Sequence, residues 1–310
     1  MTSLFDPLQL GAIKLPNRFF MAPLTRARAG REAVPNELMA RYYAQRASAG
    51  LIISEATGIT RQGLGWPGAP GLWNDDQVEG WKLVTDAVHH EGGRIVAQLW
   101  HMGRLVHPDL GGGQPVSSSA TTAPDYAHTY EGKKPYVEAR AATGDDIKRI
   151  IDDYAHAARN AMAAGFDGVQ IHGANGYLVD QFLRSSANLR DDEYGGSITN
   201  RIRFARQVLE AVGAEIGIDR VGIRFSPNIH VQGVEDRDPV ALFTELAKLL
   251  EELRVPWIEL REPDKPTSAG SIPTAPVSPA MRAHYSGRIV INSDQDWTDA
   301  RARIAAGHAD

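Results

Sequence analysis

The sequence contains no cysteine among its 310 residues. This absence excludes disulfide bonds, thiolate nucleophiles, cysteine-ligated iron–sulfur clusters and cysteine zinc sites. Long apolar runs are also missing, since none approaches the ~20 residues that a membrane helix needs. The first ten residues, MTSLFDPLQL, lack the basic region and the apolar core of a signal peptide. We therefore expect a cytoplasmic protein with no membrane partner.

The chain has no surplus of positive charge either. Its formal net charge of −5 at pH 7 gives no electrostatic reason to expect nucleic acid as a partner. Hydrophobic residues at 43% and charged residues at 23% are typical of a soluble globular protein. Neither an interdomain linker nor an internal repeat is visible, so residues 1–310 are predicted to form a single domain.

Short apolar runs alternate with helical patterns along the chain. Residues 4–15 predict a hairpin that turns at Gly11. Strand-like runs follow at residues 17–23, 51–56, 94–99, 169–171, 221–225, 257–260 and 289–291. Helical stripes occur between them at residues 35–50, 78–88, 147–161, 199–212 and 239–253, and a short helix precedes the last strand. Thr143 with Asp146 resembles a capping box, and Asp238 before a proline resembles an N-cap.

This alternation predicts an α/β fold. Apolar runs without clean alternation, separated by helical crossovers, are typical of parallel strands that are buried on both faces. About seven such units in a chain of this length predict a TIM (β/α)8 barrel, whose full form has eight units. A doubly wound open sheet is the alternative. Residues 104–138 are rich in Gly, Pro, Ser and Tyr, and we expect them to form a long excursion loop.

A glycine-containing turn follows one of the predicted strands and presents His172, Asn175 and Tyr177. Gly173 and Gly176 free its backbone to take up a tight or left-handed conformation. Two neutral hydrogen-bond donors with a phenol just beyond can hold a carbonyl oxygen and deliver a proton near it. That is the chemistry of polarising an α,β-unsaturated carbonyl, and catalytic groups of barrel enzymes sit just after strands. The alternative is a loop whose polar residues satisfy one another.

Polar side chains also occur at the other strand ends, which converge on one face of a barrel. Gln98 can present a donor and an acceptor to an imide edge, and Arg224 can place a positive charge where a reduced ring would carry negative charge. Such a set suits a planar heterocycle with an anionic tail. The strand-end residues are Pro23, Leu24, Thr25, Ala56, Gln98, Trp100, His172, Asn175, Tyr177, Arg224, Arg261, Glu262, Asn292, Ser293 and Asp294.

With these residues in view, the chain resembles the Old Yellow Enzyme family of FMN-dependent ene-reductases, in particular its classical bacterial members. The resemblance runs from the hairpin to about residue 310 and rests on several motifs that occur in order. They are APLTR (Ala22 to Arg26), QLWHMGR (Gln98 to Arg104), HGANGYL (His172 to Leu178), DEYGGS (Asp192 to Ser197) with Asn200 and Arg201, and NSD (Asn292 to Asp294). The resemblance implies bound FMN and transient NADPH or NADH as the reductant.

The resemblance implies an FMN site at the strand ends. Thr25 would hydrogen-bond the flavin carbonyl beside the reactive nitrogen. Gln98 and Arg224 would hold the pyrimidine side of the ring, and Ser293 with Asp294 would offer backbone groups near the phosphate. The whole set of implied FMN contacts is Pro23, Leu24, Thr25, Ala56, Gln98, His172, Arg224, Ser293 and Asp294.

The resemblance also implies the reaction, which is reduction of the C=C bond of enones, enals or maleimides. His172 and Asn175 would bind the carbonyl oxygen, flavin hydride would reach the β-carbon and Tyr177 would protonate the α-carbon. Trp66 and Trp100 would wall the substrate pocket, although Trp66 stands where many family members carry tyrosine. The lack of cysteine separates the chain from the iron–sulfur relatives and from the subgroup with cysteine at position 25.

Simpler interpretations remain open for several residues. Thr25 can cap the following segment, Arg224 can be a salt-bridge residue at the barrel mouth, and Trp100 can belong to the core. For the whole protein, the alternatives are a non-catalytic, truncated flavin-binding remnant and a barrel glycosidase that uses Glu55 and Glu262.

Gly63, Gly65 and Gly68 match the GxGxxG dinucleotide fingerprint. That motif works only where the glycines open a helix, whereas prolines interrupt this one and no helical stripe begins until after Trp73. We therefore predict a pocket loop here and expect the nicotinamide cofactor to bind transiently over the flavin.

The sequence ends at Asp310. In the family that the chain resembles, the residues that follow this position form the eighth strand, and a Gly-Arg turn after that strand binds the FMN phosphate. We therefore expect this sequence to be an incomplete or cut form of an active enzyme, with the eighth βα unit missing. This sequence alone would form an open barrel with unpaired edges at its first and seventh strands, and we expect it to retain FMN weakly and to be poorly soluble.

Overall fold

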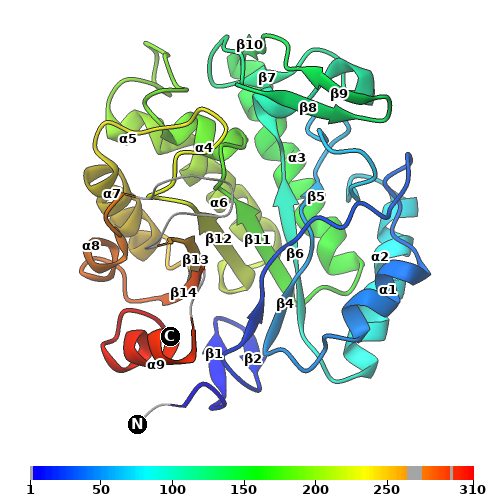
Figure 1. Ribbon diagram of the computed structural model, residues 1–310, viewed down its shortest axis with the longest axis vertical. Coiled ribbons are helices and arrows are strands. Elements are labelled where there is room, and N and C mark those ends of the chain that lie inside the picture. Colours follow the sequence, from blue (N-terminus) through cyan, green and yellow to red (C-terminus); the bar gives the residue numbers. More distant parts are fainter. Residues whose placement is uncertain (1–2, 264–273, 294–295) are drawn as a thin grey trace.

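The computed structural model describes residues 3–263, 274–293 and 296–310 (Figure 1). Its centre is a sheet of eight parallel strands. From one edge to the other, these are β14 (Arg288–Asn292), β13 (Trp257–Arg261), β12 (Val221–Phe225), β11 (Gly168–His172), β6 (Ile95–Trp100), β4 (Leu51–Ile53) and β3 (Phe20–Met21). The short β5 (Thr57–Gly58) pairs with β6 beyond the end of β4. β4 and β5 therefore lie on the same side of β6, and the eight strands occupy seven places across the sheet.

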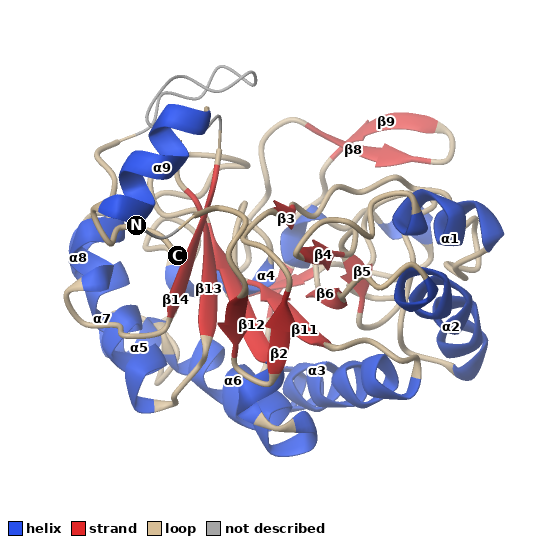
Figure 2. Ribbon diagram, turned by 90° about the horizontal axis from the view of Figure 1, so that it is seen from below, coloured by secondary structure: helices blue, strands red, loops and turns tan. Residues whose placement is uncertain are grey.

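The strands follow one another across the sheet in the order of the sequence. A doubly wound sheet would reverse its strand order at a switch point, and the described strands show no reversal. The sheet is curled, and helices lie along its outer side (Figure 2). This is the architecture of a β/α barrel. The predicted α/β barrel fold is therefore confirmed, and the doubly wound alternative is wrong.

α-Helices connect the strands and cover the outer side of the sheet. They are α1 (Glu37–Ala44), α2 (Asp75–His90), α3 (Gly144–Ala163), α4 (Leu178–Leu183), α5 (Ile198–Arg201), α6 (Arg203–Ile216), α7 (Pro239–Glu252), α8 (Ser278–Arg282) and α9 (Trp297–Ala305). Short 3-10 helices occur at Gly103–Leu105, Pro108–Leu110 and Ile218–Arg220. Within the described residues, none of the helices is long and apolar enough to cross a bilayer.

Side-chain caps fix several helix starts. Thr143 and Asp146 form a complete capping box at α3, and Asp238 caps α7 with a proline in its first turn. Both predicted starts are confirmed. Asn36 caps α1, which ends at Ala44 and is therefore shorter than the predicted helix over residues 35–50.

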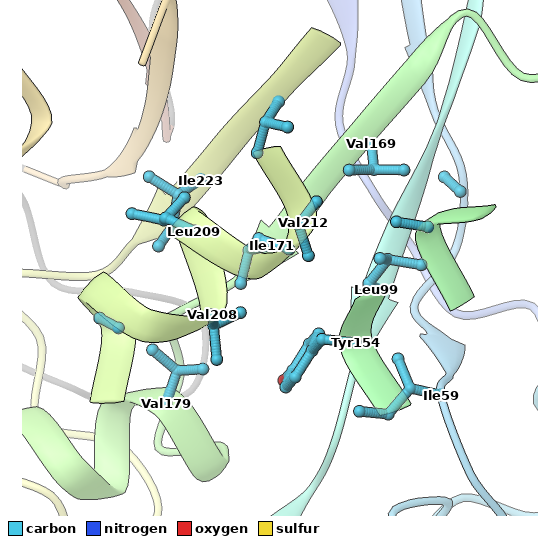
Figure 3. Packing of buried hydrophobic residues seen from close by; sticks show 14 of the residues in the cluster. Ile59, Leu99, Tyr154, Val169, Ile171, Val179, Val208, Leu209, Val212 and Ile223 are labelled. Atoms are coloured by element: carbon cyan, nitrogen blue, oxygen red, sulfur yellow. The ribbon is translucent and has the colours of Figure 1, made fainter. Parts of the chain in front are cut away.

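Apolar side chains on the outer face of the sheet pack under the helices (Figure 3). β11 contributes Val169 and Ile171, and α6 contributes Val208, Leu209 and Val212. All five are fully buried, and burying such a side chain contributes roughly 1.5–3 kcal/mol relative to exposure. Because side chains alternate along a strand, this layer also fixes which residues of β11 point to the inner side.

A hairpin fills the inner side of the sheet near the N-terminal ends of the strands. It consists of β1 (Leu8–Leu10) and β2 (Ile13–Leu15). Its apolar side chains pack against an inner-face set, which is Leu51, Ile53, Val96 and Trp257. Gly11 turns the hairpin with φ 58°, and a Cβ there would lie 1.9 Å from the carbonyl oxygen of Asp219. The predicted hairpin is confirmed, and it closes one end of the sheet.

Residues 104–138 are more regular than predicted. β8 (Tyr126–Thr129) and β9 (Gly132–Pro135) form an antiparallel hairpin, drawn at the top of Figure 1. β7 (Val116–Ser117) pairs in parallel with β10 (Arg140–Ala141). The β8–β9 hairpin carries mostly polar and partly exposed residues, so it has no apolar strand pattern that sequence analysis could detect.

β3 and β14 are the two edges of the sheet, and within the described residues they do not pair with each other. A cavity of about 330 Å³ lies between them. Its walls come from both strands, from α9 and from the chain near Leu4, and Glu259 of β13 also borders it.

Candidate functional site

Polar side chains form a layer on the inner side of the sheet. Strand pairing places Gln98 beside Gln170, His172 beside Arg224, and Arg224 beside Glu259. Each of these side chains is at most 6% exposed. Because buried polar groups need partners, this layer must either satisfy itself or meet a ligand.

His172 ends β11, and its imidazole is held in one tautomer. Nδ1 accepts a hydrogen bond from the backbone N–H of Ala174 at 3.3 Å, so the proton lies on Nε2. Burial, together with the cations of Arg224 and Arg261, lowers the pKa of His172 well below its usual value. The side chain is therefore a neutral donor through Nε2 at physiological pH.

Asn175 lies in the turn after β11 with a left-handed backbone, φ 59°. Its backbone N–H donates to Oγ of Ser226 at 2.8 Å. Its side-chain Oδ1 accepts a hydrogen bond from Nη1 of Arg261 at 2.9 Å. Because this contact occupies the oxygen, the amide offers Nδ2 as a second neutral donor.

Tyr177 belongs to an aromatic cluster with His172 and Trp100. Its ring centroid lies 4.8 Å from that of His172 and 5.0 Å from that of Trp100. Trp66 and Tyr177 both pack against a buried hydrophobic cluster that includes Trp100, and Trp66 contacts His128 of β8 with a centroid distance of 4.5 Å. Burial raises the pKa of Tyr177, so its hydroxyl keeps its proton at neutral pH and is available as an acid.

A buried ion pair holds the turn in place. The Oδ1 of Asp180 accepts from Nε of Arg184 at 2.7 Å, and its Oδ2 accepts from the backbone N–H of Gly176 at 2.9 Å. Arg184 also donates to the backbone carbonyls of Ser226 and Pro227. The pair therefore joins the turn after β11 to the loop after β12, and sets the backbone on either side of Asn175.

Gln98 and Arg224 lie where the pyrimidine edge of FMN is expected. Nε2 of Gln98 donates to Gln170, which leaves its Oε1 to accept from an imide N–H. The Nε of Arg224 is buried without an aligned hydrogen-bond partner among the described residues, although Oε1 of Glu259 lies 3.2 Å away. An acceptor and an incompletely satisfied buried cation fit an imide edge and a ring that becomes negative on reduction. The residues present therefore fit FMN.

The expected contacts near the reactive part of the flavin come from two other strand ends. Pro23 and Thr25 are half-buried, and Leu24 between them is 56% exposed. Ala56 is buried just after β4. Thr25 does not cap a helix, because Asn36 caps the next one.

Ser293 and Asp294 were expected near the phosphate. Ser293 directly follows β14, is half-buried and has φ 145°, an uncommon backbone conformation for a residue other than glycine. Asp294 lies outside the described residues.

The two carboxylates of the glycosidase alternative have structural partners. Glu55 accepts from the backbone N–H groups of Arg26 and Ala27 at 2.9 and 3.1 Å, so it anchors the segment after Thr25. Glu262 accepts from two backbone N–H groups at the start of α8. Neither arrangement leaves a pair of free carboxylates for glycoside hydrolysis.

Three contributors to this site were missed or given no role in the sequence analysis. Gln170 and Glu259 lie two residues before His172 and Arg261, so they share the inner face of the same strands. A polar residue at i−2 from a candidate site residue, inside an apolar strand, is the signal that could have found them. Asp180 gave a weaker signal, an i,i+4 pairing with Arg184.

His101, in the QLWHMGR motif, is a structural residue of this region. Its Nδ1 accepts from the backbone N–H of Gly103 at 3.0 Å, and its carbonyl accepts from the backbone N–H of Leu178, at the start of α4. Burial lowers the pKa of His101 to about 3.

We expect His101→Gln to reduce the loss of stability in acid. Below pH ~6.5 an unfolded histidine binds a proton, whereas folded His101 stays neutral down to about pH 3. The unfolded state therefore binds more protons in this window, and the free energy of unfolding falls by about 1.4 kcal/mol per pH unit for this residue as pH decreases. Urea unfolding of both proteins between about pH 4 and 6.5 measures the difference. Parallel pH profiles would contradict the expectation.

Comparison with known proteins gives strong similarity over nearly the whole chain. A sequence model of the NADH:flavin oxidoreductase / NADH oxidase family matches residues 3–278. The old yellow enzyme homologue from Zymomonas mobilis is 52% identical, with a TM-score of 0.97 over 99% of this chain and 87% of that chain. Morphinone reductase in complex with tetrahydroNAD is 42% identical, with a TM-score of 0.93 over 100% and 85%. Chanoclavine-I aldehyde reductase of Penicillium roqueforti is 48% identical over 84% of this chain and 70% of its own length.

Proposed function

Because the chain belongs to the NADH:flavin oxidoreductase / NADH oxidase family, which includes the old yellow enzymes, we propose that it reduces the C=C bond of α,β-unsaturated carbonyl compounds. Family membership makes the protein an FMN-dependent NAD(P)H oxidoreductase that acts on small molecules. The finer proposal depends on one observation, the pair of neutral donors at His172 and Asn175.

These two donors bind the carbonyl oxygen of the substrate. Nε2 of His172 and Nδ2 of Asn175 are the groups that their other contacts leave available. As hydride arrives at the β-carbon, negative charge develops on the carbonyl oxygen, and preorganised donors stabilise that charge. A protonated imidazole is not required, which agrees with the lowered pKa of His172.

FMN, when bound, supplies the hydride and is itself reduced by NAD(P)H. Gln98 and Arg224 hold the pyrimidine edge through the acceptor and the cation described above. Thr25, directly before the residues that Glu55 anchors, would contact the ring when FMN is bound. These residues orient the cofactor, whereas His172 and the turn after β11 bind the substrate.

The substrates are small activated alkenes such as enones, enals and maleimides. Trp100 lies beside Tyr177, and Trp66 packs against the same hydrophobic cluster as Tyr177. Flat aromatic side chains of this kind suit a planar conjugated molecule. The name of the Penicillium roqueforti relative gives it an aldehyde substrate, which is in line with a carbonyl-binding pocket.

An anaerobic titration tests the proposal. Protein saturated with FMN should lose its yellow absorbance when NADPH or NADH is added, and cyclohexenone should restore it. Bleaching that no enone, enal or maleimide reverses would favour the non-catalytic flavin-binding alternative. Protein that folds and yet binds no FMN would contradict the proposed site.

Tyr177→Phe should slow reoxidation of the reduced enzyme by an enone about 10²–10⁴-fold, the usual contribution of a positioned acid. Bleaching by NAD(P)H should keep its rate, because hydride transfer into the flavin needs no phenol. Stopped-flow measurement of the two half-reactions separates these steps. Equal slowing of both would show that Tyr177 supports the pocket and does not donate the proton.

A further inference from the structure

Buried side chains of the inner layer form a hydrogen-bonded series that contains two residues without a role in the proposed reaction, Gln170 and Glu259. Nε2 of Gln98 donates to Oε1 of Gln170 at 2.7 Å, and Nε2 of Gln170 donates to Oε2 of Glu259 at 2.8 Å. The other carboxylate oxygen accepts from Nδ2 of Asn292 at 2.9 Å and lies 3.2 Å from Nε of Arg224. Glu259 therefore joins Gln98 and Arg224 into one network.

The carboxylate of Glu259 determines how the amide groups of Gln170 and Gln98 are oriented. An ionised carboxylate can only accept hydrogen bonds, so Gln170 must turn its NH2 group toward Glu259 and its oxygen toward Gln98. Gln98 must then turn its own NH2 group toward Gln170. As a result its oxygen faces the cofactor side, where an imide N–H needs an acceptor. A neutral amide in place of Glu259 would not impose this order.

The carboxylate of Glu259 also reduces the positive charge that Arg224 presents to the flavin site. Glu259 is 1% exposed, and a buried carboxylate is tolerated only when it is paired and hydrogen-bonded. Arg224 is its cationic partner, and the amides of Gln170 and Asn292 supply the remaining donors. A negative charge this close offsets part of the field of the guanidinium at any ring that Arg224 contacts.

We propose that Glu259 is a positioning residue that sets both the amide direction of Gln98 and the charge that Arg224 presents to the flavin. The inference rests on the proposed assignment of Gln98 and Arg224 to the pyrimidine edge. It assigns the tuning of cofactor affinity and reduction potential to a side chain that does not itself touch the substrate.

Glu259→Gln in the FMN-loaded protein tests the charge. Gln keeps the size of the side chain but leaves Arg224 without its counter-charge, so the negative reduced ring is stabilised. The ratio of reduced to oxidised flavin at a fixed ambient potential should rise about tenfold, which is about 30 mV for a two-electron couple. Equilibration with a redox dye measures this shift without any substrate.

Gln170→Met tests the amide direction. This change breaks the link between Gln98 and Glu259 but keeps the Glu259–Arg224 pair. The dissociation constant of FMN, measured by flavin fluorescence, should rise about tenfold, while the potential stays at the wild-type value. Glu262→Gln is the control for loss of a buried carboxylate, since Glu262 accepts from the backbone N–H groups of Val277 and Ser278 and shares no hydrogen bond with Gln98, Gln170, Glu259 or Arg224 among the described residues. Its potential and FMN affinity should match the wild type.

A wild-type potential in Glu259→Gln, or wild-type FMN affinity in Gln170→Met, would overturn the inference. If Glu259→Gln does not bind FMN, the FMN dissociation constant of Gln170→Met tests the inference instead, and a wild-type value would overturn it. Wild-type protein that binds no FMN would overturn the proposed function as well. Normal turnover of the wild type with both variants unaffected would overturn this inference alone.

Discussion

Replacing His172 and Asn175 together with alanine is expected to lower kcat/KM for a cyclic enone by about 10³-fold or more, because a single donor to a developing oxyanion contributes about 10²–10³ in rate. Both donors are preorganised by other contacts, His172 by the N–H of Ala174 and Asn175 by Arg261. FMN should remain bound, since Gln98 and Arg224 are unchanged. Absorbance of the purified variant reports the flavin, and enone-dependent reoxidation reports the loss.

Asn175→Asp is the matched control for this result. Aspartate keeps the volume of the side chain and the contact with Arg261, but it replaces the Nδ2 donor with an acceptor. Its effect on reoxidation should equal or exceed that of Asn175→Ala. An aspartate variant with wild-type turnover would show that the amide fills space and does not bind the carbonyl oxygen.

The barrel fold was predictable because its signal is local. Each strand is a short apolar run with a helical stripe after it, and the predicted strand over residues 221–225 matches β12. The predicted strand over residues 51–56 was only partly right, because β4 ends at Ile53 and the next strand, β5, begins only at Thr57. At the break, the backbone N–H of Glu55 donates to the hydroxyl of Tyr43 and not to a neighbouring strand. The hydroxyl of Tyr43, on α1, therefore ends the strand, and no local pattern in residues 51–56 reveals this contact.

The helix α4 directly after the site was not predicted, for a similar reason. All six residues of Leu178–Leu183 are buried, so the helix has no polar face and no periodic stripe. Its interior position is possible because Asp180 and Arg184 neutralise each other there. Sequence patterns detect amphipathic helices, and this helix is not amphipathic.

The candidate site was predictable in its residue types but not in their orientation. His172, Asn175 and Tyr177 could be named because they follow a strand in a glycine-containing turn. Which atom of each side chain faces the pocket depends on the N–H of Ala174 and on Arg261, and these contacts require the fold. The connection from Gln98 to Glu259 depends on strand register across β6, β11, β12 and β13, which is a long-range property.

Removing the carboxylate that anchors the turn should have the largest effect on stability. Asp180→Ala leaves Arg184, which is 1% exposed, without its counter-charge and frees the backbone N–H of Gly176. Breaking a buried pair by removing one partner costs about 3–5 kcal/mol. Urea unfolding measures this loss. Turnover should also fall, because Gly176 lies between Asn175 and Tyr177.

Glu210→Ala is the control with the same helical spacing. Glu210 pairs with Arg206 at i,i+4 on the surface of α6, and such exposed pairs contribute about 0.3–0.5 kcal/mol. A combined Asp180→Leu and Arg184→Met change should recover much of the lost stability, because no unpaired charge stays buried. It should not recover turnover, since the bond to Gly176 is still missing. Recovery of both would mean that Asp180 contributes through stability alone and does not position the turn.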